Sequence, residues 1–175
     1  MNDLLFEDIT VVRADGTVQP HRYVTVRDGI FAGVDESCPQ ENVSRRIPAS
    51  SLMMMPGLVN AHTHVPMTLM RGYGDDMQLN DWLFNRIFPF EDKLTGDAVY
   101  WGSLLGIAEM LSTGTTSFSD MYCFCDRIAD AVEESGIKAN IGRGISCFDE
   151  NQKFADLPAC RELEQLLGER QDGAN

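Results

Sequence analysis

The sequence predicts an α/β fold with a small all-β segment in front of it, and three observations lead to that prediction. Strand-like and helix-like patterns alternate after Pro56, short β-rich runs precede it, and a pair of histidines stands at the end of the first apolar run after it. Strands and helices that alternate with connections of this length form parallel strands joined by right-handed crossovers. We therefore expect two domains, residues 1–55 and residues 56–175.

Residues 1–55 have the signals of short strands joined by tight turns. Residues 4–12 are largely apolar and β-branched, and Asp15-Gly16 is a dipeptide typical of hairpin turns. A second β-branched run, residues 23–26, leads to the turn dipeptide Asp28-Gly29. These features predict a small all-β element.

From Pro56 onward the pattern changes to alternating strands and helices. Three runs have strand character, the first of them apolar enough to be buried: Leu58–Ala61, Thr115–Ser119 and Ile137–Arg143. Three segments have helical character, the first two followed by a glycine that can end a helix: residues 96–112, 126–135 and 157–170. A complete (β/α)8 barrel takes about 250 residues, so the chain after residue 55 has room for the first three or so βα units. We therefore expect a barrel that is incomplete in this chain.

The composition suits a folded chain and argues against two classes of partner. The 175 residues are 43% hydrophobic, which is ordinary for a domain with a core. The formal net charge of −13 disfavours a nucleic-acid surface, because phosphate contacts need clustered Lys and Arg. No stretch approaches the roughly 18 apolar residues of a membrane span. The first residues lack a signal-peptide pattern, and we interpret the five irregularly spaced cysteines as thiols, so the cytoplasm is the expected location.

The tripeptide His62-Thr63-His64 is the most informative feature for function. Residues two apart on a strand point to the same face, so both imidazoles, together with Asn60, are expected to face one way. Paired imidazoles at the carboxyl end of a barrel strand suit a divalent metal such as zinc or iron. Zinc takes about four ligands, or three and a water, so two histidines are half of a site. The alternative is that both rings only form hydrogen bonds or face solvent.

Five stretches around and after the histidines are distinctive sequence motifs: PGLVNAHTH at 56–64, PMTLMRG at 66–72, DWLF at 81–84, FPFEDKLT at 88–95 and STGTT at 112–116. In these motifs the chain resembles the amidohydrolase superfamily, and in particular the aminohydrolase branch that includes 5'-methylthioadenosine/S-adenosylhomocysteine deaminases and triazine chlorohydrolases. The resemblance covers residues 1–150. It implies the amino-terminal part of a (β/α)8 metal-dependent hydrolase barrel, preceded by strands of a small β-sandwich.

The resemblance implies roles for five residues. His62 and His64 match the first-strand ligands of one divalent metal, zinc first and iron as the alternative. Glu91 matches a glutamate that accepts hydrogen bonds from ribose hydroxyls, and its alternative is a solvated carboxylate at a helix end. Trp82 matches an aromatic residue near the substrate pocket, and its alternative is packing on the barrel. Arg143 matches an arginine at the mouth of the site, where a charged residue at the end of a barrel strand favours function.

The resemblance also implies a reaction, in which a metal-activated water attacks the amidine carbon of an aminopurine nucleoside-like substrate and ammonia leaves. The family's other ligands, two histidines and an aspartate from later strands, and its proton-shuttling glutamate have no counterpart in this sequence. A second family arginine, for the carboxylate of larger substrates, has no clear counterpart either. We therefore assign no catalytic residue and expect this chain alone to be inactive.

Two alternative functions stay open at the level of the sequence. One is the hydrolysis of a cyclic amide or of a triazine substituent, which uses the same metal chemistry. The other is a non-catalytic module that assembles with a partner, because an incomplete barrel leaves strand edges unpaired. The expected partner for the main interpretation is a small-molecule, aminopurine nucleoside-like substrate, with no nucleic acid and no membrane, and a homo-oligomer is left open.

Three further features are interpreted as structural. Cys123-Phe124-Cys125 lacks a second cysteine pair, and we expect it to begin a helix and not to bind metal. Asp120, placed after a predicted strand and before that helix, is expected to be a helix N-cap. The run Met53–Met55 is expected to pack in the core.

Overall fold

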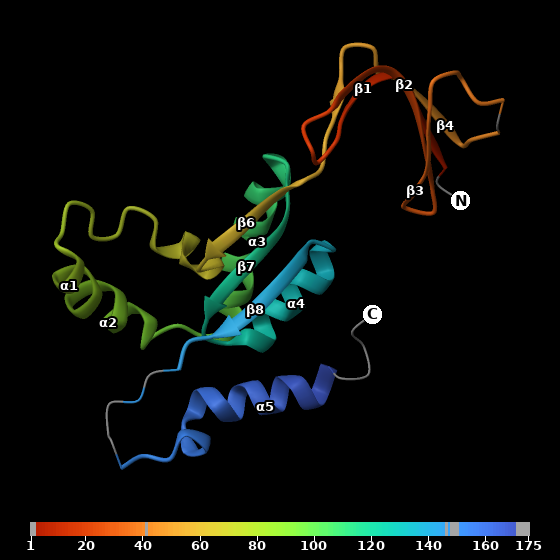
Figure 1. Cartoon of the computed structure of the whole chain (residues 1–175). Helices are drawn as coiled ribbons and strands as arrows, with labels where there is room; N and C mark the ends of the chain where they lie inside the picture. The colour runs from red at the N-terminus through yellow and green to blue at the C-terminus, as the bar shows by residue number, and fades with distance from the viewer. Residues whose placement is uncertain (1–2, 41, 146, 148–150, 171–175) are drawn as a thin grey trace. The chain divides into compact units, whose positions relative to one another are not determined.

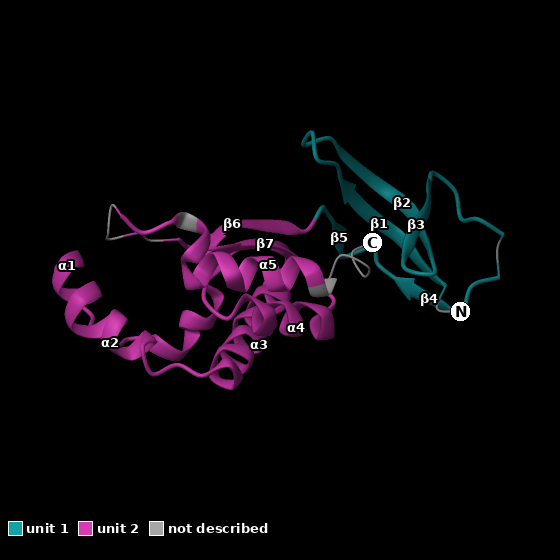
Figure 2. Cartoon of the chain, turned by 90° about the horizontal axis from the view of Figure 1, so that it is seen from below, with its two compact units in different colours: residues 1–56 teal, residues 57–175 magenta. Residues whose placement is uncertain are grey.

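The computed structural model describes residues 3–40, 42–145, 147 and 151–170. The chain divides into two compact units, residues 1–56 and residues 57–175 (Figure 2). Across the described ranges, every helix is too short or too polar to cross a bilayer.

The first unit is a five-stranded sheet in the order β3-β2-β1-β4, with β5 also beside β1. Its strands are β1 (Leu4–Val12), β2 (Val18–Arg27), β3 (Ile30–Asp35), β4 (Arg45–Pro48) and β5 (Met53–Met54). The strand β1 pairs antiparallel with β2 and parallel with β4 and β5. Both expected turns are present, because Gly16 and Gly29 have φ values of +83° and +78°, which favour glycine.

The core of the first unit is small, and the methionine run contributes little to it. Ile9, Val24 and Ala49 form a buried cluster, against which Met54 packs. Met53 and Met55 are 62% and 56% exposed, so their expected place in the core is wrong. The cause is the alternation of an extended chain, which sends neighbouring side chains to opposite faces.

The second unit contains three parallel strands in the order β6-β7-β8, joined by helices (Figure 1). Its strands are β6 (Leu58–Thr63), β7 (Thr115–Tyr122) and β8 (Lys138–Arg143). Its main helices are α3 (Gly96–Ser112), α4 (Cys125–Ser135) and α5 (Pro158–Arg170). Short helical segments fill the connections: η1 (Val65–Met70), α1 (Leu79–Trp82), the π-helical turn η2 (Leu83–Ile87), α2 (Phe88–Glu91) and η3 (Phe154–Asp156).

The helices α3 and α4 pack against each other and against the parallel sheet (Figure 1). Their apolar side chains join those of β7 and η1 in one buried cluster that includes Val65, Val99, Ile107, Phe118 and Ile128. The Thr95 hydroxyl accepts a hydrogen bond from the Ala98 N–H and so caps α3, as the strong preference for Thr at this position predicts. This core holds the carboxyl ends of the three strands at a fixed edge.

The first barrel strand differs from its expectation. Leu58 and Val59 on β6 are 52% and 69% exposed, so the prediction of a buried strand is wrong. Within the described part of the chain β6 pairs only with β7, which leaves its other edge without a neighbouring strand.

Candidate functional site

The carboxyl ends of β6, β7 and β8 lie at one edge of the parallel sheet, where the functional residues of such sheets gather. His62 and His64 come from the end of β6 and Arg143 ends β8. Asp120 and Tyr122 lie at the end of β7. The candidate site is built on this edge.

The two predicted metal ligands lie side by side. Their ring centroids are 5.0 Å apart, and the rings are nearly perpendicular, at 78°. Two imidazoles on one tetrahedral zinc have centroids about 5 Å apart, because zinc–nitrogen distances are about 2.0–2.1 Å. The arrangement of His62 and His64 therefore fits a shared metal ion.

A backbone contact determines which ring nitrogen of His64 carries a proton. Its Nδ1 lies 2.6 Å from the Met121 carbonyl oxygen, which can only accept a hydrogen bond, so Nδ1 is the donor. The proton on Nδ1 leaves the Nε2 lone pair for a ligand bond. Metal-binding histidines are commonly held in this way by a carbonyl or carboxylate behind the ring.

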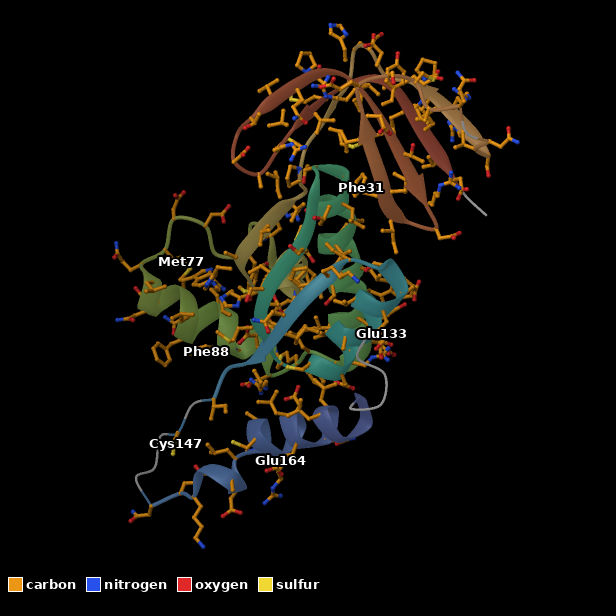
Figure 3. The ribbon with its side chains drawn as sticks, turned by 45° about the vertical axis from the view of Figure 1, so that its right-hand side comes forward. Phe31, Met77, Phe88, Glu133, Cys147 and Glu164 are labelled. Atoms are coloured by element: carbon orange, nitrogen blue, oxygen red, sulfur yellow. The ribbon has the colours of Figure 1, made fainter. Side chains whose placement is uncertain are left out.

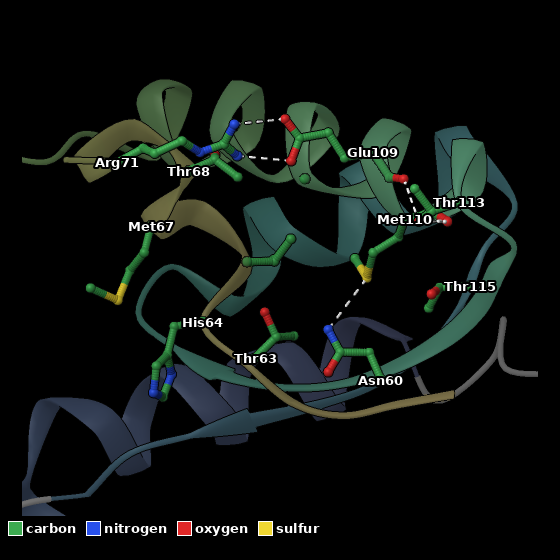
Figure 4. A pocket seen from close by; sticks show the side chains of 12 residues that line it. Asn60, Thr63, His64, Met67, Thr68, Arg71, Glu109, Met110, Thr113 and Thr115 are labelled. Carbon is green, nitrogen blue, oxygen red and sulfur yellow. Dashed lines mark hydrogen bonds and ion pairs between the residues drawn. The ribbon is translucent and has the colours of Figure 1, made fainter. Parts of the chain in front are cut away.

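Asn60 lies next to the histidine pair, because its Oδ1 accepts the His62 N–H at 3.3 Å and it lines one hollow together with His64. Its amide nitrogen donates to the Met110 thioether of α3 at 3.8 Å, in a hollow of about 570 Å³ beside the Arg71–Glu109 ion pair (Figure 4). The pairing of β6 with β7 shifts register between Asn60 and Thr63. Such a shift locally interrupts the pairing of the two strands.

Four of the five residues assigned from the sequence line one cavity of about 320 Å³: His64, Trp82, Glu91 and Arg143. Ligand pockets commonly enclose about 300–1,000 Å³. The fifth, His62, lies outside the lining, but its ring packs edge-on against that of His64. The structure thus places residues near one another that are far apart in the sequence, from His62 to Arg143.

Arg143 is held on one side by residues outside the strands. Its Nε donates to Glu162 Oε2 at 2.7 Å, and its Nη1 donates to the Gly144 carbonyl at 3.0 Å. Glu162 belongs to α5, and its Oε1 accepts the Cys125 N–H at 2.7 Å, in the first turn of α4. Sequence reasoning missed Glu162, because nothing local indicates that α5 docks here.

The segment Cys123-Phe124-Cys125 begins a helix, as predicted, since α4 starts at Cys125. Burial raises the pKa of the Cys123 thiol to about 11 and that of Cys125 to about 12, although Arg143 lowers both values. In the described part of the chain, no three His, Cys, Asp or Glu side chains form a metal-binding group. The two imidazoles side by side are therefore a pair without a third such side chain among the described residues.

Asp120 is not a helix N-cap, so that expectation is wrong. The residue lies inside β7, which continues to Tyr122, and α4 begins only at Cys125. Asp120 is 3% exposed, and its Oδ1 accepts the Val65 N–H at 2.6 Å, directly after the histidine pair. Burial raises its pKa to about 6, against the opposing effects of the Val65 hydrogen bond and the two imidazoles.

Tyr122 is a second site residue that sequence reasoning missed. It lines the same cavity, and its ring centroid is 6.4 Å from that of His64. Phe118, Asp120 and Tyr122 are all buried, which is a period of two along β7. The sequence does not show this alternation, because Asp120 is a polar residue on the buried face and Met121, 44% exposed, is an apolar residue on the other face.

Comparison with known proteins gives consistent matches. The sequence profile of the amidohydrolase family matches residues 53–170. A 5-methylthioadenosine/S-adenosylhomocysteine deaminase of Carboxydothermus hydrogenoformans is 53% identical over 117 residues, which are 67% of this chain and 27% of that protein. A 5'-deoxyadenosine deaminase of Methanosarcina barkeri is 47% identical over 135 residues, 77% of this chain and 31% of that protein.

A solved structure agrees with these relatives. An adenosine deaminase from Xanthomonas campestris, crystallised with bound zinc, superimposes with a TM-score of 0.80 at 34% sequence identity. The match covers 97% of this chain and 39% of that one. This chain spans between about a quarter and a third of the length of the two curated relatives.

Proposed function

Since this chain belongs to the amidohydrolase family, we propose that it supplies two metal ligands and part of the substrate pocket of an aminopurine nucleoside deaminase. The fold is that of the amino-terminal part of a (β/α)8 metal-dependent hydrolase barrel, preceded by strands of a small β-sandwich. One observation carries the proposal: His64, Trp82, Glu91 and Arg143 line a single cavity beside the paired imidazoles.

His62 and His64 are the proposed ligands of one divalent metal, with zinc first and iron as the alternative. The spacing of the rings and the contact of His64 Nδ1 with the Met121 carbonyl both suit this role. A bound divalent ion lowers the pKa of water and so makes hydroxide available near neutral pH. The other ligands would come from parts of the barrel beyond the two imidazoles.

The cavity residues are proposed to hold the nucleoside. The Glu91 carboxylate accepts hydrogen bonds from sugar hydroxyls, and the Trp82 ring covers an apolar part of the ligand. Arg143 places a positive charge at the mouth of the cavity, where its Nε is already bound to Glu162. Fixing the ligand in this way holds its reactive carbon in position, which lowers the entropic part of the barrier. The net reaction is the replacement of a ring amino group by oxygen with release of ammonia.

The first test is metal binding by the 175-residue chain. We expect equilibrium dialysis and elemental analysis to find zinc bound to the chain, and to find it lost in the double variant His62→Ala, His64→Ala. His21→Ala is the matched control, because His21 is 80% exposed and pairs with Asp8 in the first unit. Equal zinc retention by the double variant and the control would contradict the proposed ligands.

The second test is ammonia release from adenosine, methylthioadenosine and S-adenosylhomocysteine. It uses this chain and a version extended to the length of its relatives, both loaded with zinc. We expect activity in the extended version only. Activity in neither would overturn the deaminase proposal, and hydrolysis of a cyclic amide or a triazine by the extended version would replace it.

The proposal also covers the cellular location of the protein and leaves its oligomeric state to experiment. We place it in the cytoplasm, a reducing compartment, because all five cysteines are thiols. Light scattering of the chain in solution tests whether it forms a homo-oligomer.

A further inference from the structure

The hydroxyl of Tyr122 is a buried polar group without a well-formed hydrogen bond among the described residues. Tyr122 is 6% exposed, and within the described residues no group meets normal hydrogen-bond geometry with its hydroxyl, although the Glu91 carboxylate lies close enough to raise its pKa. Buried polar groups nearly always have a partner, so such an exception calls for a physical reason. Tyr122 lines the 320 Å³ cavity, which makes a ligand the candidate partner.

Several other hydrogen-bond donors of the cavity are already engaged. Arg143 donates from Nε to Glu162 and from Nη1 to Gly144, and the Trp82 indole donates to the Tyr73 carbonyl at 3.3 Å. His64 donates from Nδ1 to Met121. Among the described residues, the Tyr122 hydroxyl and the Nη2 group of Arg143 are therefore the strong donors of this lining that still lack an acceptor.

The acceptor side of the cavity is Glu91, the carboxylate among its lining residues. Burial raises the pKa of the Tyr122 phenol, and the nearby Glu91 carboxylate raises it further, so the phenol keeps its proton at neutral pH. Arg143 and the Cys123 thiol are the other titratable groups of the lining beside His64. A neutral phenol donates a hydrogen bond, whereas an ionised carboxylate only accepts.

We propose that Tyr122 and Glu91 together select a ligand hydroxyl. The phenol donates to the oxygen of that hydroxyl, and the hydroxyl donates its own proton to the Glu91 carboxylate. A group that accepts and donates at the same point is matched to this pair, whereas a ligand with hydrogen in its place leaves both protein groups unsatisfied. The inference rests on the proposed function and assigns Tyr122 as a determinant of specificity for one sugar hydroxyl of the nucleoside.

The alternative is that Tyr122 is only a core residue, packed against His64. The substitution Tyr122→Phe separates the two, because it removes the hydroxyl and keeps the ring. Removing an unpartnered buried hydroxyl is nearly neutral or stabilising for folding. We therefore expect the metal-free 175-residue chain to unfold in urea at the same or a higher midpoint. Tyr100→Phe is the matched control and should lower the midpoint, because the Tyr100 hydroxyl donates to Glu134.

The binding experiment compares adenosine with 2'-deoxyadenosine and 3'-deoxyadenosine. Equilibrium dialysis is carried out on the extended chain and on its Tyr122→Phe and Tyr100→Phe variants, all freed of metal with a chelator so that the nucleosides are not deaminated. The unchanged protein should bind adenosine about fivefold to tenfold more tightly than one of the two analogues, the effect of one hydrogen bond. Tyr122→Phe should lose that preference and bind the disfavoured analogue as before, whereas Tyr100→Phe should keep it.

Three outcomes would overturn the inference. One is an unchanged preference for the hydroxyl in Tyr122→Phe, which leaves the proposed deaminase function standing. The second is a clear loss of stability in Tyr122→Phe, because the hydroxyl would then have a partner within the protein. The third is failure of the extended chain both to bind and to deaminate adenosine, which overturns the proposed function along with the inference.

Discussion

Glu162 on α5 joins Arg143 at the end of β8 to the first turn of α4. Its two carboxylate oxygens accept hydrogen bonds from Arg143 Nε and from the Cys125 N–H, both at 2.7 Å. The residue before α4, Phe124, has a left-handed conformation and offers no capping side chain. The carboxylate thus satisfies an N–H group of that helix end and lies where the helix dipole favours negative charge.

We expect Glu162→Gln to lower the free energy of unfolding by about 1–2 kcal/mol, because two hydrogen bonds to a charged group are weakened. The Cys125 amide should also exchange its hydrogen faster. Glu164→Gln is the matched control on the same helix, where Glu164 is exposed (Figure 3). Equal stability and equal amide exchange in the two variants would show that the Glu162 contacts do not hold α5 in place.

The helices of the second unit could be predicted closely because their signals are local. The period of apolar residues predicts a helix over residues 96–112, and α3 is Gly96–Ser112. Strand ends depend on distant partners. The strand expected at Thr115–Ser119 continues to Tyr122, because Asp120 and Tyr122 pair with Ile141 and Arg143 of β8. No residue within β7 indicates that pairing in the sequence.

The residues of the candidate site also fall into those that the sequence indicates and those that depend on distant contacts. The pairing of His62 with His64 follows from the period of a strand, and Glu91 and Trp82 were assigned through the family resemblance. Glu162 contacts the site only because α5 folds back against α4, which the sequence does not indicate. Asn60 also donates to the Met110 thioether of α3, a partner that the sequence of one strand does not indicate.

Two glycines of α3 allow η1 to lie close to the helix directly after His64. A Cβ atom on Gly106 would lie 2.7 Å from Val65 Cγ2, and one on Gly102 would lie 2.9 Å from the Pro66 carbonyl oxygen. We expect Gly106→Ala to destabilise the chain by about 1–2 kcal/mol, since overpacking outweighs the better helix propensity of Ala. Urea unfolding measures the change.

Gly168→Ala on α5 is the control for this substitution, because a Cβ atom there meets no atom within 4 Å. It should stabilise the chain by up to about 1 kcal/mol through helix propensity alone. Equal shifts of the same sign in both variants would contradict the close approach of η1 and α3.

The cysteines should differ in their reaction with iodoacetamide. Thiolate is the reactive form, and burial raises the pKa values of Cys123 and Cys125 to about 11 and about 12, so little thiolate exists at pH 8. Cys147 is exposed and should react first (Figure 3). Labelling of Cys123 and Cys125 should rise about tenfold per pH unit until their pKa values are approached. Peptide mass spectrometry measures each site, and rapid labelling of Cys125 in the folded chain at pH 8 would contradict its burial.

Asp120 should matter for zinc binding without touching the metal. Its Oδ1 holds the Val65 N–H, the first backbone group after His64, at 2.6 Å. Asp120→Ala leaves that buried N–H without an acceptor and should destabilise the chain by about 1–3 kcal/mol. Asp120→Asn keeps an amide oxygen at the same place and should retain most of the stability. Because the backbone at Val65 positions the His64 ring, we expect zinc affinity in equilibrium dialysis to fall further in the Ala variant than in the Asn variant. Equal affinities would mean that the Met121 carbonyl alone is enough to orient the ring.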